Sequence, residues 1–514
     1  MKSSTSSVIT SIGILNVFLL ISCAAFSLPK HEKIHPSCFS SSTLASKGSS
    51  IRSSSSLDAA RKEICIVGGG FGGLNAALTL SSLPFPPDQK PTITLIDKKE
   101  RFVFLPLLYE LCVGDADINE VAPTYRSMLK GTDIKFKQAT VDGIDAENNT
   151  VFFDGGGGSQ QKISYDSLIV ATGADVNLEP IPGAQSLALP FYTISDCLEL
   201  RKRLKLLDSL ADDIDRQLEV VVVGGSYSGV ELALNVKERL DLLKKGVKVT
   251  VIHRGKEVLN YAAEYNQKTG LDRLQKSGVE IRTDTSVVQV MDRDGDGDDV
   301  HEQSDIADLN GRARVLVEKD SVQQTLNADI LLWTAGAMRT NVQKGILNSK
   351  LPRDASGRLV TDKYLAVKGC DNVFALGDCS RVKKVPYGAT AAVAMQQAPF
   401  AAWNVYSSIM MDAGAREADQ KLKPLPFSYL DLGEMLTLGG EDASISSLGL
   451  VEASGPAASV LRRLIYAVRM PTTQQALTAA ISSATKRFEA LLVSSSRNAK
   501  SGDKGGKKII NWKQ

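Results

Sequence analysis

The sequence predicts an α/β protein with two parallel-sheet units of the same local design, followed by a helical C-terminal region. One observation is a repeat: an apolar strand-like run, a glycine-rich turn and a helix-like run occur from residue 63 and again from residue 218. The other is a matched spacing, because in each copy a second strand ends equally far beyond the last glycine, at residues 97 and 253. This order indicates two Rossmann-like dinucleotide-binding domains.

The first glycine turn has the pattern Gly68-x-Gly70-x-x-Gly73. In such a turn the first glycine permits the tight bend, the second lets a pyrophosphate approach the backbone, and the third lets the helix pack close to the strand. Asp97 ends the next strand and precedes Lys98, where a carboxylate accepts hydrogen bonds from an adenosine ribose. The alternative interpretation is a glycine turn in an α/β protein that holds no ligand.

The second glycine turn has the pattern Gly224-x-Ser226-x-x-Gly229, with serine in place of the middle glycine. The serine keeps the backbone donors, but its side chain narrows the approach of a pyrophosphate. The strand after this turn ends at His253-Arg254 instead of a carboxylate. A cation at this position favours the 2′-phosphate of NADPH over NADH. The alternative is an exposed basic pair without a role in nucleotide binding.

Three further strand-like runs end in small or acidic residues, namely Thr172-Gly173, Ala335-Gly336 and Gly377-Asp378. The first two mark points where the chain crosses from one nucleotide domain to the other. A carboxylate directly after a glycine at a strand end, as at Asp378, can bind the ribityl or ribose hydroxyls of a long flavin cofactor. The combination of two turns, two crossings and this acid predicts FAD on the first domain and NAD(P)H on the second.

Composition excludes several function classes. The 514 residues provide enough apolar sequence for two or more domains, and 60 lysines and arginines stand against 58 aspartates and glutamates. A chain with almost no net charge does not create the overall positive electrostatic field that attracts nucleic acid. The seven cysteines form no close pair, which argues against a flavin-dependent disulphide reductase. Residues 292–299 match the start of a calcium loop, but Gln303 replaces its last ligand, so we expect an acidic hairpin tip and no metal.

The N-terminal residues predict a targeting leader. An apolar run from Ile12 to Ile21 precedes small residues that suit signal-peptidase cleavage, and residues 26–60 are rich in serine and poor in acids. A signal peptide followed by a transit-like segment resembles the bipartite leader of proteins in complex algal plastids. Ordinary secretion with a serine-rich linker is the alternative, and a mitochondrial destination is a second one.

The combined motifs resemble the two-dinucleotide flavoproteins, and more narrowly the type II (alternative) NAD(P)H:quinone oxidoreductases, from about residue 61 to about residue 488. The stretch Ala389–Gln397 is similar to the Ala-Gln-x-Ala-x-Gln-Gln helix of that family, with Ala392 in place of its first glutamine. Residues 403–404 and 432–439 resemble the plastid C-type branch.

This resemblance implies an enzyme that passes hydride from NAD(P)H, with NADPH favoured, to FAD and then two electrons to a membrane quinone without pumping protons. The implied quinone is plastoquinone or a phylloquinone-type acceptor, and the implied location is the thylakoid or plastoglobule membrane. The resemblance places Glu231 near the nicotinamide, and Gln396 and Gln397 at the contact of flavin and quinone. It also implies dimerisation through the C-terminal region.

The order of these features predicts the domain organisation. We expect a signal peptide at 1–25, a transit-peptide-like leader at 26–60, an FAD-binding domain at 61–180 and 341–405, an NAD(P)H-binding domain at 181–340, a C-terminal quinone and membrane region at 406–495, and a basic tail at 496–514.

Residues 459–470 predict an amphipathic helix, and residues 476–493 a second helix. The apolar face of the first comprises Val460, Leu461, Leu464, Ile465 and Val468, and the arginines off that face are Arg462, Arg463 and Arg469. Such helices suit peripheral association with a membrane that carries the quinone. A core or dimer helix with a solvated basic edge is the alternative.

Three rival functions remain open at this stage. One is a reductase of a soluble acceptor, which would have no membrane affinity. Another is a sulfide:quinone oxidoreductase, for which Cys197, Cys370 and Cys379 are available, although the second glycine turn argues against it. The last is a flavoprotein whose redox state controls binding to a partner.

Overall fold

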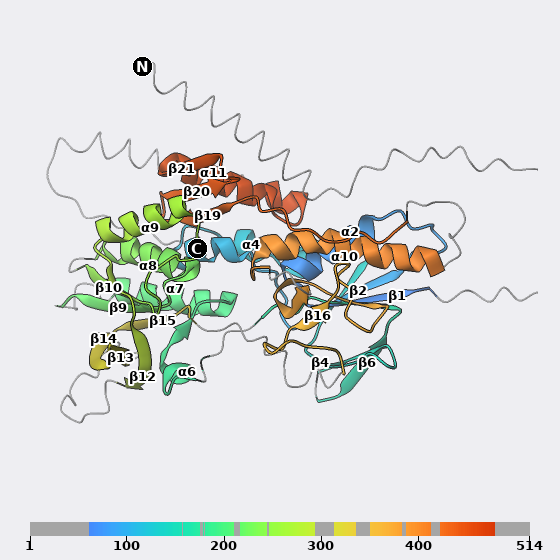
Figure 1. Cartoon of the computed structure of the whole chain (residues 1–514), viewed down its shortest axis with the longest axis horizontal. Coiled ribbons are helices and arrows are strands. Elements are labelled where there is room, and N and C mark those ends of the chain that lie inside the picture. Colours follow the sequence, from blue (N-terminus) through green and yellow to red (C-terminus); the bar gives the residue numbers. More distant parts are fainter. Residues whose placement is uncertain are drawn as a thin grey trace, which may run out of the picture. The chain divides into compact units, whose positions relative to one another are not determined.

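The computed structural model describes residues 61–156, 158–174, 178, 180–209, 216–243, 246–292, 313–335, 350–382, 387–412 and 422–477. These residues form two compact units, which are described separately (Figure 1). The first unit comprises the described residues up to Val103, those of Thr124–Gln185 and those of Ala335–Leu432. The second comprises Phe104–Pro123, the described residues of Ser186–Thr334, and those from Gly433 on.

A five-stranded parallel sheet forms the centre of the first unit, in the order β17-β7-β1-β2-β3. Its strands are β1 (Glu63–Val67), β2 (Thr92–Asp97), β3 (Ile134–Gln138), β7 (Ser167–Val170) and β17 (Val373–Ala375). Helix α2 (Phe71–Ser82) follows β1, and the long helix α10 (Ala391–Asp412) packs along it. Because all five strands run in the same direction, their carboxyl ends share one edge, where ligands bind in folds of this kind.

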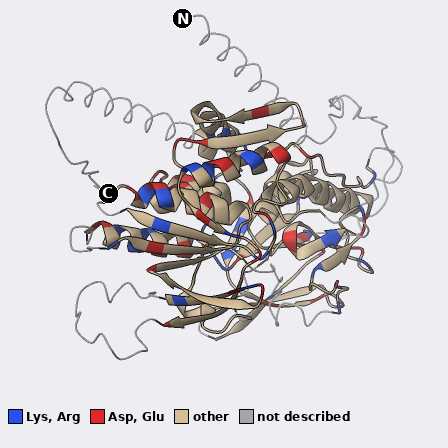
Figure 2. Ribbon diagram, turned by 60° about the vertical axis from the view of Figure 1, so that its left-hand side comes forward, with Lys and Arg blue, Asp and Glu red and all other residues tan. Residues whose placement is uncertain are grey.

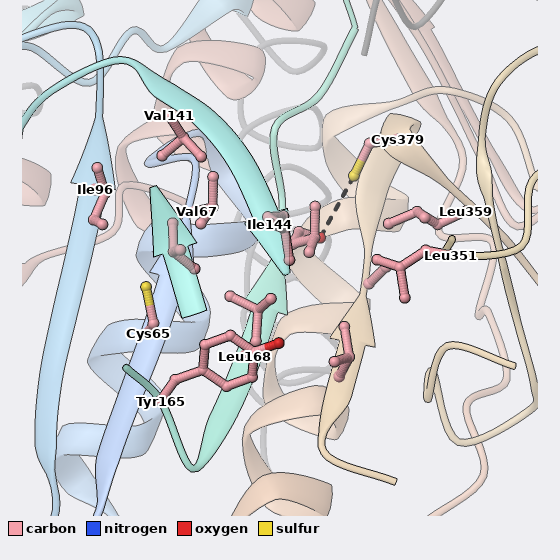
Figure 3. Packing of buried hydrophobic residues seen from close by; sticks show 14 of the residues in the cluster. Cys65, Val67, Ile96, Val141, Ile144, Tyr165, Leu168, Leu351, Leu359 and Cys379 are labelled. Atoms are coloured by element: carbon pink, nitrogen blue, oxygen red, sulfur yellow. Dashed lines mark hydrogen bonds between the residues drawn. The ribbon is translucent and has the colours of Figure 1, made fainter. Parts of the chain in front are cut away.

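The core of the first unit lies against this sheet (Figure 3). Figure 3 shows Cys65 and Val67 from β1, Ile96 from β2 and Leu168 from β7 pointing into one apolar cluster. Leu351 joins the cluster from a segment far along the chain. Near-continuous apolar strands such as these are expected in a parallel sheet that is covered on both faces.

Smaller elements complete the first unit. An antiparallel sheet is formed by β4 (Val141–Asp145), β5 (Thr150–Asp154) and β6 (Gln160–Ser164), and a parallel pair by β16 (Leu359–Thr361) and β18 (Ser380–Val382). The short helices are α5 (Tyr125–Met128) and the 3-10 turn η3 (Gly377–Cys379), while α6 (Ala184–Leu187) spans the boundary between the units in the sequence.

The second unit repeats the parallel design, in the order β11-β10-β9-β15-β8. Its strands are β8 (Leu189–Pro190), β9 (Leu218–Val223), β10 (Val247–Ile252), β11 (Glu280–Arg282) and β15 (Ile330–Trp333). An antiparallel sheet follows β11 in the chain and comprises β12 (Ser286–Asp292), β13 (Ala313–Lys319) and β14 (Val322–Ala328). The helices are η2 (Leu105–Leu107), α3 (Leu108–Val113), α4 (Ile118–Val121), α7 (Ile194–Ser209), α8 (Tyr227–Leu240) and α9 (Glu264–Lys276).

The C-terminal part of the described chain belongs to the second unit. It consists of a three-stranded antiparallel sheet and a helix that packs on it (Figure 1). The elements are β19 (Glu434–Thr437), β20 (Ala443–Ser447), β21 (Val451–Ser454) and α11 (Pro456–Val468). Among the described residues, no helix combines the length and the apolar character that crossing a bilayer requires.

The predicted α/β class with two strand-turn-helix units is confirmed. The described C-terminal part, which was predicted to be helical, is a three-stranded sheet with one helix, and its association with a membrane stays a prediction. Residues 104–123, which the sequence placed with the first nucleotide domain, lie in the second compact unit. The leader at 1–60, most of the acidic stretch 292–299, Gly336 and residues 478–514 lie outside the described residues. Along the described ribbon, basic and acidic residues are interspersed, in keeping with a nearly neutral chain (Figure 2).

Candidate functional site

The glycine turn of the first unit has the geometry that its pattern predicts. Gly68 adopts φ +98°, and a Cβ on it would lie 2.3 Å from the carbonyl oxygen of Ala171. A Cβ on Gly73 would lie 1.8 Å from the carbonyl oxygen of Gly68, so only glycine lets α2 pack this close to β1. Gly70 has open space around its Cβ position and stands at the N-cap of α2. The free N-terminus of this helix is a ready site for phosphate.

Asp97 binds the same turn from the end of β2. Its carboxylate accepts hydrogen bonds from the backbone N–H of Gly69 at 2.6 Å and from that of Lys99 at 2.7 Å, while Lys98 is exposed. Tyr125 supports the turn as well, because its hydroxyl donates to the carbonyl oxygen of Gly69 at 2.8 Å. The sequence did not single out Tyr125, since nothing in the local pattern around a lone tyrosine indicates a contact with a distant turn.

The other predicted residues of the first unit lie at the same edge of its sheet. Val170, the last residue of β7, pairs with both Val67 and Ala375, so Thr172-Gly173 and Gly377-Asp378 follow strand ends that are neighbours. Asp378 lines a pocket with Arg358 and Gln397. Burial raises the pKa of Asp378 to about 6, and the charge of Arg358 opposes that rise.

The two glutamines of α10 are buried and each binds backbone. The Gln396 side chain donates to the Leu430 carbonyl oxygen at 2.9 Å and accepts from the Leu430 N–H at 3.0 Å. The Gln397 side-chain oxygen accepts from the N–H of Gly377 at 2.7 Å. Gln397 therefore lies at the pocket of Asp378, whereas Gln396 anchors the segment that follows the helix.

The residues of this edge fit an FAD molecule. The bare helix N-terminus at Gly70 suits a pyrophosphate, and the open space there leaves room for it. Carboxylates stand on both sides of the turn, at Asp97 and Asp378, where hydroxyl groups of the cofactor need acceptors.

The glycine turn of the second unit repeats this geometry with one change. Gly224 adopts φ +120°, and a Cβ on Gly229 would lie 1.8 Å from the carbonyl oxygen of Gly224, as at Gly73 in the first unit. Ser226 occupies the N-cap of α8, and its side chain makes no capping hydrogen bond. The N-terminus of α8 is therefore open to phosphate, with the serine side chain beside it.

His253 takes the place that Asp97 has in the first unit. The backbone N–H of Gly225 donates to Nδ1 of His253 at 3.3 Å, just as the N–H of Gly69 donates to Asp97. Burial lowers the pKa of His253, and the hydrogen bond to Nδ1 also requires a neutral imidazole. The cation that the sequence places at this strand end is therefore the exposed Arg254, whereas the lowered pKa of His253 favours a neutral imidazole. On the neighbouring strand end, Ala335 follows β15.

Glu231 lies in α8 and is buried beneath the C-terminal sheet of its own unit. Its Oε1 accepts from the backbone N–H of Thr437 in β19 at 2.9 Å, and the hydroxyl of Tyr109 hydrogen-bonds the same carboxyl group. Burial raises the pKa of Glu231 to about 7, while the hydrogen bond from Thr437 and the charge of Arg462 oppose the rise. A carboxyl group with this pKa can take up and release a proton near neutral pH.

Comparison with known proteins identifies the family that shares this arrangement. The model of the family described as pyridine nucleotide-disulphide oxidoreductase matches residues 62–398. The chain belongs to this family. The cysteines within the described residues form no disulphide, and burial raises the pKa of the Cys379 thiol.

Two curated relatives narrow the assignment. The chain is 33% identical to demethylphylloquinone reductase of Synechocystis sp., over 83% of this chain and 96% of the relative. It is 35% identical to the chloroplastic/mitochondrial alternative NAD(P)H-ubiquinone oxidoreductase of Arabidopsis thaliana, over 83% of this chain and 81% of the relative. NDH2 of Plasmodium falciparum, solved in complex with NADH, has the same fold with a TM-score of 0.69 and 19% identity, over 83% of this chain and 98% of that one. The chain is thus a member of the type II NAD(P)H:quinone oxidoreductases, as the motifs predicted.

Proposed function

We propose that this protein is a type II NAD(P)H:quinone oxidoreductase that binds FAD on its first unit and NAD(P)H on its second. The paired turn geometry carries the proposal. Both units present a bare helix N-terminus for phosphate, but the residue that binds the turn is a carboxylate in one unit and a neutral histidine beside an arginine in the other. Two similar but unequal sites suit two different dinucleotides.

Bound FAD supplies two-electron chemistry, since it accepts hydride from a nicotinamide and passes the electrons to a quinone. A quinone takes up two electrons and two protons, of which NAD(P)H supplies both electrons and one proton as hydride. The second proton comes from solvent. We assign its transfer to Glu231, because a buried carboxyl group with a pKa near 7 is both a stable reservoir and a ready donor.

Steady-state turnover tests the function. The chain from residue 57 on, loaded with FAD, is expected to oxidise NADPH in the presence of liposomes that contain a decyl-quinone, with one quinol formed for each NADPH consumed. Oxidation that is independent of quinone would contradict the proposal and favour a reductase of a soluble acceptor. Binding of both cofactors without turnover would favour a redox-controlled binding protein.

Arg254 is expected to set the coenzyme preference. Arg254→Glu replaces the arginine that follows β10 by a carboxylate, which repels a 2′-phosphate and can accept a hydrogen bond from a ribose 2′-hydroxyl group. We expect kcat/KM for NADPH to fall about tenfold or more, which corresponds to about 1.4 kcal/mol, while the value for NADH is kept. Lys256→Glu, an equal charge change two residues on and also exposed, is the control. An equal loss of kcat/KM for NADPH in both variants would mean that the coenzyme preference comes from the overall positive charge of this surface and not from a contact with Arg254.

The reductase works at a membrane in this proposal, as a lipid-soluble quinone requires. Helix α11 supports this, because part of its apolar face is exposed, although Ile465 of that face is buried. Arg462 is 1% exposed, whereas Val460 and Leu464 are partly exposed and Val468 is 44% exposed. The exposed apolar stripe suits the interface of a bilayer. Flotation of the protein with quinone-free liposomes tests the association.

The finer location and assembly are also proposals. Relatives named as chloroplastic/mitochondrial and cyanobacterial, together with the transit-like leader of the sequence, favour the plastid, on the thylakoid or plastoglobule membrane, over the mitochondrion. We propose a homodimer formed through the C-terminal region. A plastoquinone or a naphthoquinone of the phylloquinone type is the proposed acceptor.

A further inference from the structure

A fully buried ion pair joins the C-terminal helix to the rest of the second unit. Arg462 of α11 and Glu110 of α3 are each 1% exposed, and Nη2 of Arg462 donates to Oε1 of Glu110. Nη1 of the same guanidinium donates to the carbonyl oxygen of Pro106 at 3.4 Å. Arg463 lies 3.9 Å from the same carboxylate oxygen. The sequence placed Arg462 off the apolar face of this helix, and only the alternative interpretation put it on a solvated edge; the structure buries it because Glu110 provides a partner inside the unit.

Folding alone does not account for this pair. Removing two charges from water costs about as much as their attraction returns, so a well-packed apolar pair would stabilise the unit equally or better. The pair is also incompletely satisfied, because Oε2 of Glu110 and Nε of Arg462 are buried without a hydrogen-bond partner. A half-satisfied charged pair in a core points to a role beyond packing.

The pair adjoins the site of Glu231. Tyr109, which hydrogen-bonds the Glu231 carboxyl group, is the residue before Glu110 on α3. Tyr466, one turn after Arg462 on α11, lies with its ring 5.0 Å from the guanidinium carbon. The groups that act electrostatically on Glu231 include Tyr109 and Glu110 from α3 and Arg462 and Tyr466 from α11. Burial keeps both tyrosines neutral by raising their pKa values.

We propose that the Glu110–Arg462 pair is a positioning element of the reductase, which sets the charge of Glu231 and thereby the pH range in which it delivers a proton. The proposal rests on the proposed function in that Glu231 is the proton carrier. Arg462 favours the carboxylate form of Glu231 and Glu110 favours the protonated form, with Arg462 the stronger of the two. The two members of one ion pair therefore act on Glu231 in opposite directions.

Substitutions of the pair are expected to move the titration of Glu231 in opposite directions. Arg462→Met removes the positive charge and raises the pKa of Glu231, so the alkaline limit of turnover moves up by about one pH unit. Glu110→Gln removes the negative charge and moves that limit down. Arg462→Lys keeps the charge and is expected to restore most of the wild-type profile. A merely structural pair would lower turnover at every pH without moving the limit.

Two measurements on the FAD-loaded full chain decide the matter. Infrared spectroscopy follows the protonated carboxyl band of Glu231, assigned by its loss in Glu231→Gln, from pH 5 to pH 9. Turnover of NADPH with decyl-quinone in liposomes is measured over the same range. Where a single variant does not fold, the double variant Glu110→Gln/Arg462→Met serves. The alkaline limit of turnover in this double variant is expected to move up by less than in Arg462→Met alone, because Arg462 has the stronger effect on the pKa of Glu231.

The proposal is supported if Arg462→Met moves the titration of Glu231 and the alkaline limit of turnover to higher pH, and Glu110→Gln moves both to lower pH. If the carboxyl band of Glu231 titrates at the same pH in the folded variants as in the wild type, the proposal is overturned, whatever the turnover shows. A carboxyl band that moves while the pH limit of turnover stays fixed would also overturn it, because the pair would then act on Glu231 without acting on the reaction. If the wild-type protein shows no quinone-dependent turnover, the proposed function fails, and the band alone still reports whether the pair sets the charge of Glu231.

Discussion

Gly73→Ala is expected to leave no folded first unit. The added methyl group would lie 1.8 Å from the carbonyl oxygen of Gly68. That oxygen belongs to the backbone, and the methyl group is attached directly to the backbone of α2, so neither can move aside without moving its element. Overpacking at a site that cannot relax costs about 3 kcal/mol or more, which is a large part of the stability of a typical domain. The measurement is the yield of soluble FAD-loaded protein together with its unfolding by urea.

Gly70→Ala is the matched control for this prediction. The same methyl group meets open space at Gly70, whose φ of −66° suits any residue, so folding is expected to survive. If Gly70 lies under the cofactor pyrophosphate, the control folds but binds FAD less tightly. Equal stability of the Gly73 variant and the wild type would show that α2 can move away from β1.

Glu231→Gln is expected to lower quinone-dependent turnover by about a hundredfold or more, because it removes a proton carrier while keeping the shape of the side chain. The amide oxygen can still accept from Thr437, so the C-terminal sheet is expected to stay in place. Glu238→Gln is the control, since it makes the same change at an exposed position of the same helix. Similar turnover of both variants would remove Glu231 from the mechanism.

The same substitution has a predicted effect on stability that depends on pH. Glu231 has a pKa raised from 4.5 to about 7 in the folded protein, so between these values the folded state holds a proton that the unfolded state has lost. Stability therefore falls as pH rises from about 4.5 to about 7, by about 3 kcal/mol for the whole shift. Glu231→Gln is expected to lack this contribution. The free energy of unfolding of both proteins, measured at several pH values, checks it.

The local patterns predicted the two nucleotide units because each depends on a short stretch of chain. A strand, three spaced small residues and a helix are enough to predict this turn, and the structure has it at Gly68 and Gly224. The second strand end could be located equally well, since its distance along the chain is set by the intervening helix. Family resemblance then supplied the activity and the cofactors, which the comparisons support.

Features that depend on distant segments were not predictable in this way. Tyr125 supports the first turn from far along the chain, and Glu110 meets Arg462 across most of the sequence. Helical periodicity placed the arginine off the apolar face, but it weighs only residues of the same helix and so does not show whether another element covers that side. Whether a charged side chain is exposed or buried depends on the partner that the fold brings to it.

The residues at the end of β10 also show what the sequence determines and what only the structure determines. The sequence by itself determined that a histidine and an arginine stand where the first unit has a carboxylate. Only the tertiary structure decided that the histidine is held in its neutral form, because burial lowers the pKa of His253 and the N–H of Gly225 donates to its Nδ1, while Arg254 remains in solvent. The identity of a residue is a property of the chain, but its charge in the folded protein depends on the dielectric and the hydrogen bonds that surround it.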